Sequence, residues 1–440
     1  MPNILFAIAT LAGFAVLAWR WGARRAVAIT FLVVAMLFPR NLFELGPEAT
    51  PDGYDVGLAA TAGPAITTHG VILLVAAFTV GRRAWDALSL LAVVFLAIGT
   101  ILWWPSDPHV LGGVIYLATA VCCWVVGRAL GAEGLRGQVY RTLVVVTTAL
   151  VVAEAALQLW QIATGRVDVN GRPAGTFDHA AVVGKNAVVL LLILLPATRG
   201  WTSARTSLAW VGVAAAVAAT LLSGSRANSL AVVLTLLVWI FLLPRSVMSV
   251  RRKVGLLAVL AAAVLPTLPF FVARLQEDPD GGDRPELRDA GLRVISEHPW
   301  TGTGPNNYAH VAAQTESIVQ QTGYPPHNVL LFGLAELGII GTVIFAGFVV
   351  APLLRGLRIT FTAQAPHASD VPRAAFAVFI GLIPVAATGW GLVGRNTLLL
   401  LMFVVAYIYS AMKAAQDRPV AFRSLDQVTP THGLVHREGR

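Results

Sequence analysis

Long apolar runs alternate with short polar connections along most of the chain. Hydropathy places thirteen such runs, at residues 4–19, 26–39, 64–80, 85–104, 110–129, 139–163, 180–197, 206–223, 227–243, 254–273, 327–353, 374–390 and 396–412. Most contain roughly 16 to 25 residues, about the length that an α-helix needs to cross a bilayer core. The pattern predicts an all-α, polytopic transmembrane helix bundle of about 12–13 spans, the first two of which are short enough to form one hairpin.

One long polar segment, residues 274–326, interrupts this alternation. Within it, Asp283 followed three residues later by Glu286 is typical of a helix N-cap with a capping box. A helix is therefore expected over 284–297, ending before His298-Pro299. A second short helix is expected over about 308–321. The segment is predicted to be a single long loop that carries short helices.

Charge distribution orients the bundle. The chain is 56% hydrophobic and 12% charged, with a net charge of +9. Most Lys and Arg residues fall in alternate connections, for example Arg251, Arg252 and Lys253. The positive-inside rule places that set in the cytoplasm and the 274–326 loop outside, with the N-terminus outside and the C-terminus inside. The basic excess is explained by orientation, and nucleic-acid binding is not expected.

These features divide the chain into five parts. They are N-terminal spans at 1–163, spans at 164–273 with an outer hairpin that carries Arg226, the extracytoplasmic loop at 274–326, C-terminal spans at 327–413, and a cytoplasmic tail at 414–440. The tail is polar and without periodicity, so disorder is predicted there. The two cysteines, Cys122 and Cys123, are adjacent in an apolar run, and no disulfide is expected.

Cations on the outer side are candidates for phosphate binding. Arg226 lies in a short hairpin between two apolar runs, and arginine binds phosphate through two parallel hydrogen bonds. Arg284, Arg288 and Arg293 lie on the predicted loop helix. Together they suggest a diphosphate clamp. The alternatives are an Arg226 that snorkels at a helix end and a loop helix that rests on anionic lipid headgroups.

Two histidines on the outer side are candidates for proton transfer. His327 opens an apolar run beside Asn328, and a neutral imidazole there is a suitable general base at neutral pH. His179 with Asp178 is a second candidate pair. The alternative for a lone histidine in such a place is an ordinary interfacial polar residue.

Lys185 and Asn186 lie inside an apolar run, one turn below His179. A buried lysine is costly and suggests function, although interhelical hydrogen bonding is the structural alternative, above all for Asn186. No metal site is expected, because the outer acids at 277–283 lack the ligand spacing of a calcium loop. No cofactor is expected either.

Four stretches, in this order along the chain, resemble the O-antigen ligase and O-antigen polymerase superfamily. They are Gly175-Thr176-Phe177 followed by Asn186; Ser223-Gly224-Ser225-Arg226; the loop from Arg284 through Pro299, Gly302 and Gly304 to Asn306; and His327-Asn328, nine residues, Gly338, two residues, Gly341-Thr342. The resemblance covers about residues 170–345. The last stretch is closer to the ligases than to the polymerases.

The resemblance implies a GT-C-like membrane glycosyltransferase of the inner (cytoplasmic) membrane, with its active site on the extracytoplasmic face. It implies an undecaprenyl-diphosphate-linked glycan donor, a glycan, glycolipid or protein acceptor, and metal-independent transfer. Arg226 and Arg284 would hold the diphosphate, and His327 would activate the acceptor hydroxyl. The remaining expected substrate contacts are Arg288, Arg293, Asn328, Lys185 and Asn186. The chain departs from the family pattern at Arg288, where an aromatic residue is usual, and at Lys185, where proline is usual.

Two alternatives stay open from the sequence. A polysaccharide polymerase would use the same donor and add it to another lipid-linked chain. A flippase for lipid-linked sugars would need charged residues along a central cavity through many spans, whereas this sequence concentrates them at one outer surface.

Overall fold

The computed structural model describes residues 2–37, 43–44, 65–66, 68–103, 109–135, 137–168, 171–177, 179–199, 203–244, 248–269, 272, 276, 282–362, 370–389 and 391–416. Residues 417–440, most of the predicted tail, lie outside this range, as does Asp178.

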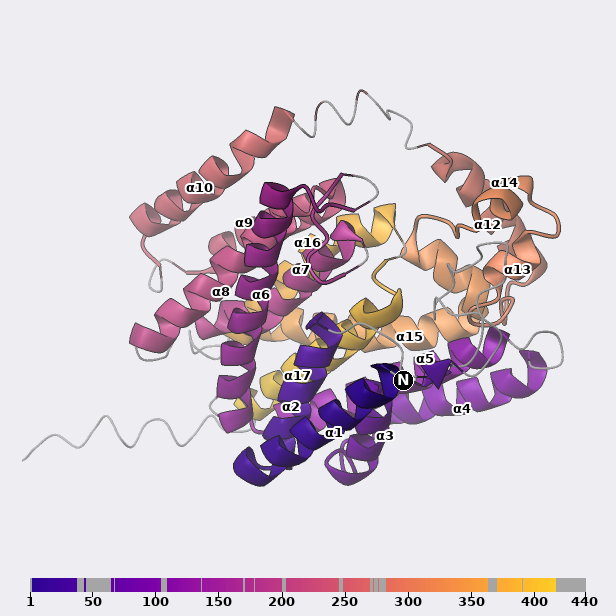
Figure 1. The fold of residues 1–440 in the computed structure, drawn as a ribbon, viewed down its shortest axis with the longest axis horizontal. Helices are drawn as coiled ribbons and strands as arrows, with labels where there is room; N and C mark the ends of the chain where they lie inside the picture. The colour runs from indigo at the N-terminus through magenta and orange to yellow at the C-terminus, as the bar shows by residue number, and fades with distance from the viewer. Residues whose placement is uncertain are drawn as a thin grey trace, which may run out of the picture.

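The chain is an all-α, polytopic helix bundle (Figure 1). Each of the thirteen predicted apolar runs coincides with one helix: α1 (Pro2–Trp21), α2 (Ala23–Leu37), α3 (Thr68–Thr79), α4 (Ala87–Trp103), α5 (His109–Gly131), α6 (Gln138–Thr164), α7 (Ala180–Ala197), α8 (Ser203–Leu222), α9 (Arg226–Leu242), α10 (Val250–Val264), α15 (Val329–Thr362), α16 (Asp370–Thr388) and α17 (Arg395–Gln416). Two short strands, β1 (Phe43–Glu44) and β2 (Ala65–Ile66), pair antiparallel.

Length and hydropathy identify membrane spans among these helices. Within the described residues, 7 helices are long and apolar enough to cross a membrane, and α3, α4 and α9 are shorter apolar helices. The prediction of a multi-pass membrane protein is confirmed at this level. The α10 helix ends earlier than the predicted run at 254–273, because Pro266 and Pro269 lack the backbone N–H that would continue it.

Helix α7 forms the centre of the bundle. All of its residues except Ala181 and Val182 are buried, between α8, α16 and α17. Gly184 brings α9 close to it, since a methyl group on Gly184 would lie 2.7 Å from both Asn228 Nδ2 and Ser223 Oγ. The beginnings of α7 and α9 are therefore fixed against each other.

Helix α15 is broken at Gly338, whose φ of 62° and ψ of −172° are not helical. The loop that precedes α13 supplies the hydrogen bonds that the break removes from the helix. These are Thr303 N–H to Ala335 O (2.9 Å), Gly304 N–H to Glu336 O (2.9 Å), Ile339 N–H to Pro299 O (2.9 Å) and Ile340 N–H to Trp300 O (3.3 Å). Buried backbone groups need such partners, so the loop and the broken helix stabilise each other.

Over residues 282–326, the described part of the polar loop contains the helices α12 (Arg284–Glu297), α13 (Tyr308–Ala312) and α14 (Ser317–Thr322). The predicted helix over 284–297 is confirmed. The single second helix was wrong, because the chain turns at 313–316 and places Glu316 against Arg293 of α12. The capping box was wrong as well: Asp283 has φ −72° and ψ 4°, not the extended backbone of a side-chain cap, and makes no capping bond.

Ion pairs join the connections that the charge count assigns to the cytoplasm. Arg24 lies 2.6 Å from Glu133 and Arg128 lies 2.5 Å from Asp86, which links three connections at one end of the bundle. Arg199 lies 3.4 Å from Asp370 and links two more. The grouping of these connections agrees with the charge count, and which end faces the cytoplasm stays a prediction.

Candidate functional site

Arg226 occupies the first turn of α9 and is half-buried. The turn is fixed by Ser225, whose Oγ accepts the Asn228 N–H at 3.5 Å. The Asn228 side chain is buried and donates to Ala181 O at 2.8 Å. Because a serine cap and an interhelical amide bond hold this hairpin, Arg226 is fixed beside the first turn of α7.

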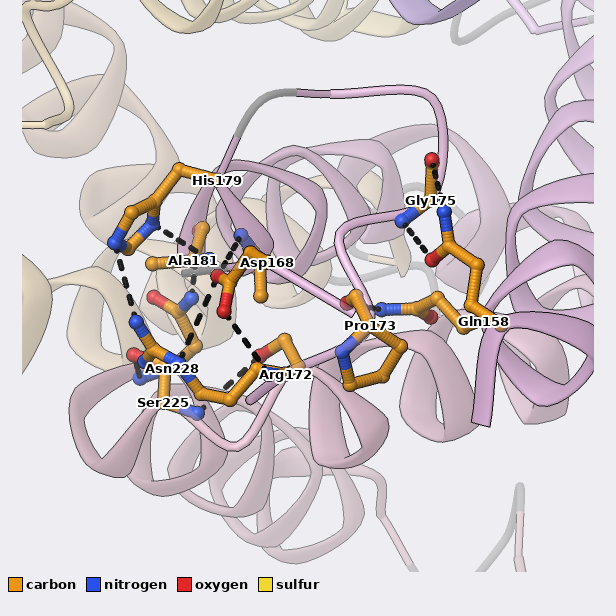
Figure 2. Close-up of polar contacts among 12 residues, drawn as sticks. Gln158, Asp168, Arg172, Pro173, Gly175, His179, Ala181, Ser225 and Asn228 are labelled. Atoms are coloured by element: carbon orange, nitrogen blue, oxygen red, sulfur yellow. Dashed lines mark hydrogen bonds and ion pairs between the residues drawn. The ribbon is translucent and has the colours of Figure 1, made fainter. Parts of the chain in front are cut away.

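The segment before α7 lies against the same hairpin (Figure 2). Asp168 Oδ1 accepts the Arg172 backbone N–H at 2.9 Å, and Asp168 Oδ2 lies 3.9 Å from Arg172 Nε. Arg172 Nη2 lies 3.1 Å from His179 Nε2. His179 also caps α7, since its Nδ1 accepts the Ala181 N–H. His179 was a sequence candidate, but its contact with Arg172 was not predicted.

Polar side chains on one face of α6 form hydrogen bonds with the segment that contains Gly175-Thr176-Phe177. Glu154 accepts the Thr176 N–H at 3.1 Å, Gln158 donates to Pro173 O at 3.1 Å, and Gln161 exchanges two 2.8 Å bonds with Gly175. Sequence reasoning missed these three residues. Their spacing of four and three places them on one helical face, which was the available signal in an otherwise apolar run.

His327 lies two residues before α15 begins and is half-buried. We call this end of the bundle, around His327 and the start of α15, the mouth. Burial and the nearby Arg284 cation hold the pKa of its imidazole below the ordinary value of 6.5, while Asp283 opposes them. Within the described part of the chain, its buried Nδ1 has no hydrogen-bond partner. The Tyr324 ring meets its edge, with centroids 6.2 Å apart. At neutral pH the imidazole is therefore uncharged and can accept a proton.

Asn328 caps α15. Its Oδ1 accepts the N–H groups of Leu330 and Leu331 at 2.9 and 3.1 Å, and its Nδ2 lies 3.4 Å from Ala387 O at the end of α16. These contacts occupy the amide and fix the position of His327 next to it.

Lys185 and Asn186 point into the bundle below this mouth. A methyl group on Gly391 would lie 1.8 Å from Lys185 Nζ, so the ammonium fills the space beside the α16–α17 connection. No hydrogen bond or ion pair to Lys185 occurs among the described residues. Asn186 is fully buried; its Oδ1 accepts from Thr397 Oγ1 at 2.9 Å, and its Nδ2 has no partner in the described part of the chain.

A series of contacts connects His327 to the hairpin that carries Arg226. His327 is tied through Asn328 to the end of α16, and three residues after α16 ends Gly391 meets Lys185 of α7. One turn before Lys185, Ala181 accepts from Asn228 of the Arg226 hairpin. The structure thus gathers the hairpin, the α7 start, the α16–α17 connection and the His327 mouth at one end of the bundle.

Arg288 and Arg293 lie farther along α12 and have carboxylate partners. Exposed Arg288 lies 3.2 Å from its neighbour Asp289. Arg293 makes a bidentate pair with Glu316 of the α13–α14 turn, which lowers the pKa of that carboxyl. The Arg293 pair joins α12 to the rest of the loop.

Glu336 is a buried acid that sequence reasoning also missed. It is fully buried within α15, and its Oε2 accepts the Asn306 N–H at 2.7 Å. Asn306 has a positive φ of 67°, rare outside glycine, and this bond supports it. A single acid in an apolar span was the signal. Among the described residues, no group of three or more His, Cys, Asp or Glu side chains could hold a metal ion.

Comparison with known proteins places the mouth and the hairpin in one family domain. Residues 211–346 match the model of a family described as O-antigen ligase. The match includes Arg226, Arg284 and His327, and it ends eight residues after the break at Gly338. The curated proteins contain no match to the chain. Residues 211–346 of this multi-pass membrane protein are thus similar to the O-antigen ligase family.

Proposed function

We propose that the protein is a metal-independent membrane glycosyltransferase. It moves a glycan from an undecaprenyl-diphosphate-linked donor to a hydroxyl group of a surface acceptor, at the extracytoplasmic face of the cytoplasmic membrane. The family match supports glycan transfer in general. The donor, the face of the membrane and the residue roles below are the specific parts of the proposal.

One observation carries it: at the mouth of the bundle lies a half-buried imidazole whose pKa is lowered by burial and by the Arg284 cation. A general base works best when its pKa is near or below the working pH and it is free to accept a proton. Burial, helped by the Arg284 cation, lowers the pKa of His327 and keeps it in that form, and Arg284 is itself a cation that can bind a phosphate oxygen. A base for the acceptor and a cation for the leaving group thus act on each other electrostatically at this mouth.

The reaction follows from these two groups. His327 removes the proton of the acceptor hydroxyl as its oxygen attacks the anomeric carbon of the donor sugar. The bond from that carbon to the diphosphate oxygen breaks, and the lipid diphosphate leaves with the bonding electrons. Arg284 and Arg226 stabilise the charge that the diphosphate gains, because cations fixed in a site act most strongly where charge develops.

The other candidate residues complete or support this clamp. Lys185 adds a third cation below the mouth, and Asn186 orients it through α7 and α17. Asn328 positions His327 by capping α15. Arg293 holds α12, and with it Arg284, against the α13–α14 turn. Exposed Arg288 is assigned to the rim, where it meets the outer part of the donor.

The test is transfer by purified protein in lipid nanodiscs, with a glycan on undecaprenyl diphosphate as donor. Two acceptors are offered separately. The first is a surface glycan or glycolipid, and the second is another glycan chain on undecaprenyl diphosphate. Product on the first acceptor with release of undecaprenyl diphosphate is expected. Product only on the second acceptor would make the protein a polymerase, and absence of transfer to either would contradict the proposal.

A further inference from the structure

Arg172 and His179 bring side-chain nitrogens together at the start of α7, outside the machinery proposed above (Figure 2). Arg172 Nη2 lies 3.1 Å from His179 Nε2. The other ring nitrogen, Nδ1, lies 3.1 Å from the Ala181 backbone nitrogen and caps the helix. The imidazole is therefore approached by an N–H group at each of its two nitrogens.

Both approaching groups are donors. A guanidinium has N–H groups and no acceptor, and a backbone amide nitrogen only donates. A neutral imidazole has one acceptor nitrogen, so the ring cannot accept from both. In the tautomer that caps α7, Nδ1 accepts from Ala181 and the proton is on Nε2, and Nε2–H then faces an N–H of Arg172. Two donors stand side by side, an arrangement that an oxygen with several lone pairs would stabilise.

The fold holds these donors in place. Asp168 binds the Arg172 backbone N–H at 2.9 Å and the Ala180 N–H at 3.3 Å. The Arg172 side chain is only 11% exposed and that of Asp168 only 2%. A large movement of Arg172 away from His179 would break this packing, so the pair is preorganised for a ligand.

We propose that Arg172 and His179 form an oxyanion-binding site, in which Arg172 Nη2 and His179 Nε2 donate to a phosphate or carboxylate group of the substrate. The site lies beside Arg226, because Asn228 of the Arg226 hairpin donates to Ala181 O at 2.8 Å. It lies before residue 211 and so outside the family match. The inference rests on the proposed function only for the origin of the anion, which is either the donor diphosphate or an acidic sugar of the glycan.

The test measures anion binding by calorimetry with the full-length protein in nanodiscs. The probes are inorganic diphosphate and, separately, glucuronate. His179→Asn keeps a good helix cap and removes the Nε2 donor, and Arg172→Gln removes the cation. Arg166→Gln is the control, because it changes the net charge by the same amount as Arg172→Gln. The Arg166 guanidinium lies over the Trp160 ring, with its Cζ 5.0 Å from the ring centroid. Melting temperatures identify any variant that fails to fold, and His179→Asn is expected to fold as the parent does.

Both variants are expected to weaken binding of one probe about tenfold, the loss typical of one charge-assisted hydrogen bond, while Arg166→Gln leaves it unchanged. Loss with diphosphate identifies the donor phosphates, and loss with glucuronate identifies an acidic sugar. Parent-like affinity of folded His179→Asn for both probes would overturn the inference. If Arg226→Gln still weakened diphosphate binding in that case, the proposed function would stand without the anion site. If both variants weakened probe binding but the parent transferred no glycan, the anion site would stand without the proposed function.

Discussion

At the scale of single residues, the protonation of His327 is the property that the fold sets most directly. Its pKa lies below 6.5 because of burial and the Arg284 cation. The base is active when neutral, so the transfer rate is expected to be constant around pH 7 and to fall in acid with a midpoint below 6.5. Arg284→Gln removes one of the two lowering effects and is expected to move that midpoint upward.

The measurement is kcat/KM for the donor against pH, which reports the pKa of the free enzyme, for the parent and for Arg284→Gln. Arg166→Gln, which lies on a different segment, controls for net charge and should keep the parent midpoint. An Arg284→Gln profile with an unchanged midpoint would show that this arginine does not act on the base.

Lys185 provides a second test at this scale, because stability and binding should change in opposite directions. A buried cation without a carboxylate partner among the described residues lowers stability, and an apolar side chain of similar length removes that cost. Lys185→Met is expected to raise the melting temperature and to weaken binding of undecaprenyl diphosphate about tenfold. Unchanged affinity together with a lower melting temperature would assign Lys185 a purely structural role.

At the scale of elements, the break in α15 is the feature that shapes the mouth. A methyl group on Gly338 would lie 2.3 Å from the Trp300 carbonyl carbon and oxygen, at a φ that favours glycine. Gly338→Ala is expected to lower the stability by about 1–3 kcal/mol and to release the 299–304 loop. Thermal unfolding and proteolysis of that loop measure both effects.

Gly255→Ala is the matched control for Gly338→Ala. Gly255 lies in α10 with nothing within 4 Å of an added methyl group. Alanine is the better helix former, so this change is expected to be neutral or slightly stabilising. Equal behaviour of the two variants would mean that the docking of the loop on α15 contributes little.

The element pattern was largely predictable from hydropathy, and its interruptions were not. Thirteen apolar runs match thirteen helices because burial in lipid or protein selects the same residue types. The break at Gly338 was hidden because its hydrogen bonds come from Pro299–Gly304, more than 30 positions earlier. The division of the predicted helix at 308–321 likewise depends on a distant partner, Arg293. Local sequence does not contain such contacts.

At the scale of the whole molecule, the central prediction is sidedness. The Arg-rich connections are joined by ion pairs, and the positive-inside rule assigns them to the cytoplasm. Exposed Gln314 lies in the opposite set and exposed Arg83 lies in the Arg-rich set. The natural Cys122 and Cys123 are buried and should give little background.

An impermeant thiol reagent on intact cells is expected to label Gln314→Cys. It should label Arg83→Cys only after permeabilisation. The reverse pattern would invert the topology and would move the candidate site to the cytoplasmic face.

The candidate site was predictable in part from sequence. Arg284 and His327 could be expected on the same side because one long polar loop carries Arg284 and leads to His327, and the charges were visible as exceptions to the positive-inside pattern. The polar face of α6 was missed although the spacing of its residues in an apolar run was a recognisable signal, and the contact between Arg172 and His179 was missed because it depends on how the segment before α7 folds. Buried Glu336 was missed although its position in an apolar run is a recognisable signal.

The most direct test of the account is the rate of glycan transfer from undecaprenyl diphosphate by the parent and by His327→Ala and Arg226→Gln, at pH 7 and saturating donor. Loss of a general base or of a cation at the leaving group is expected to slow the reaction about 100-fold or more, with folding preserved. Parent-like turnover by both folded variants would contradict the account.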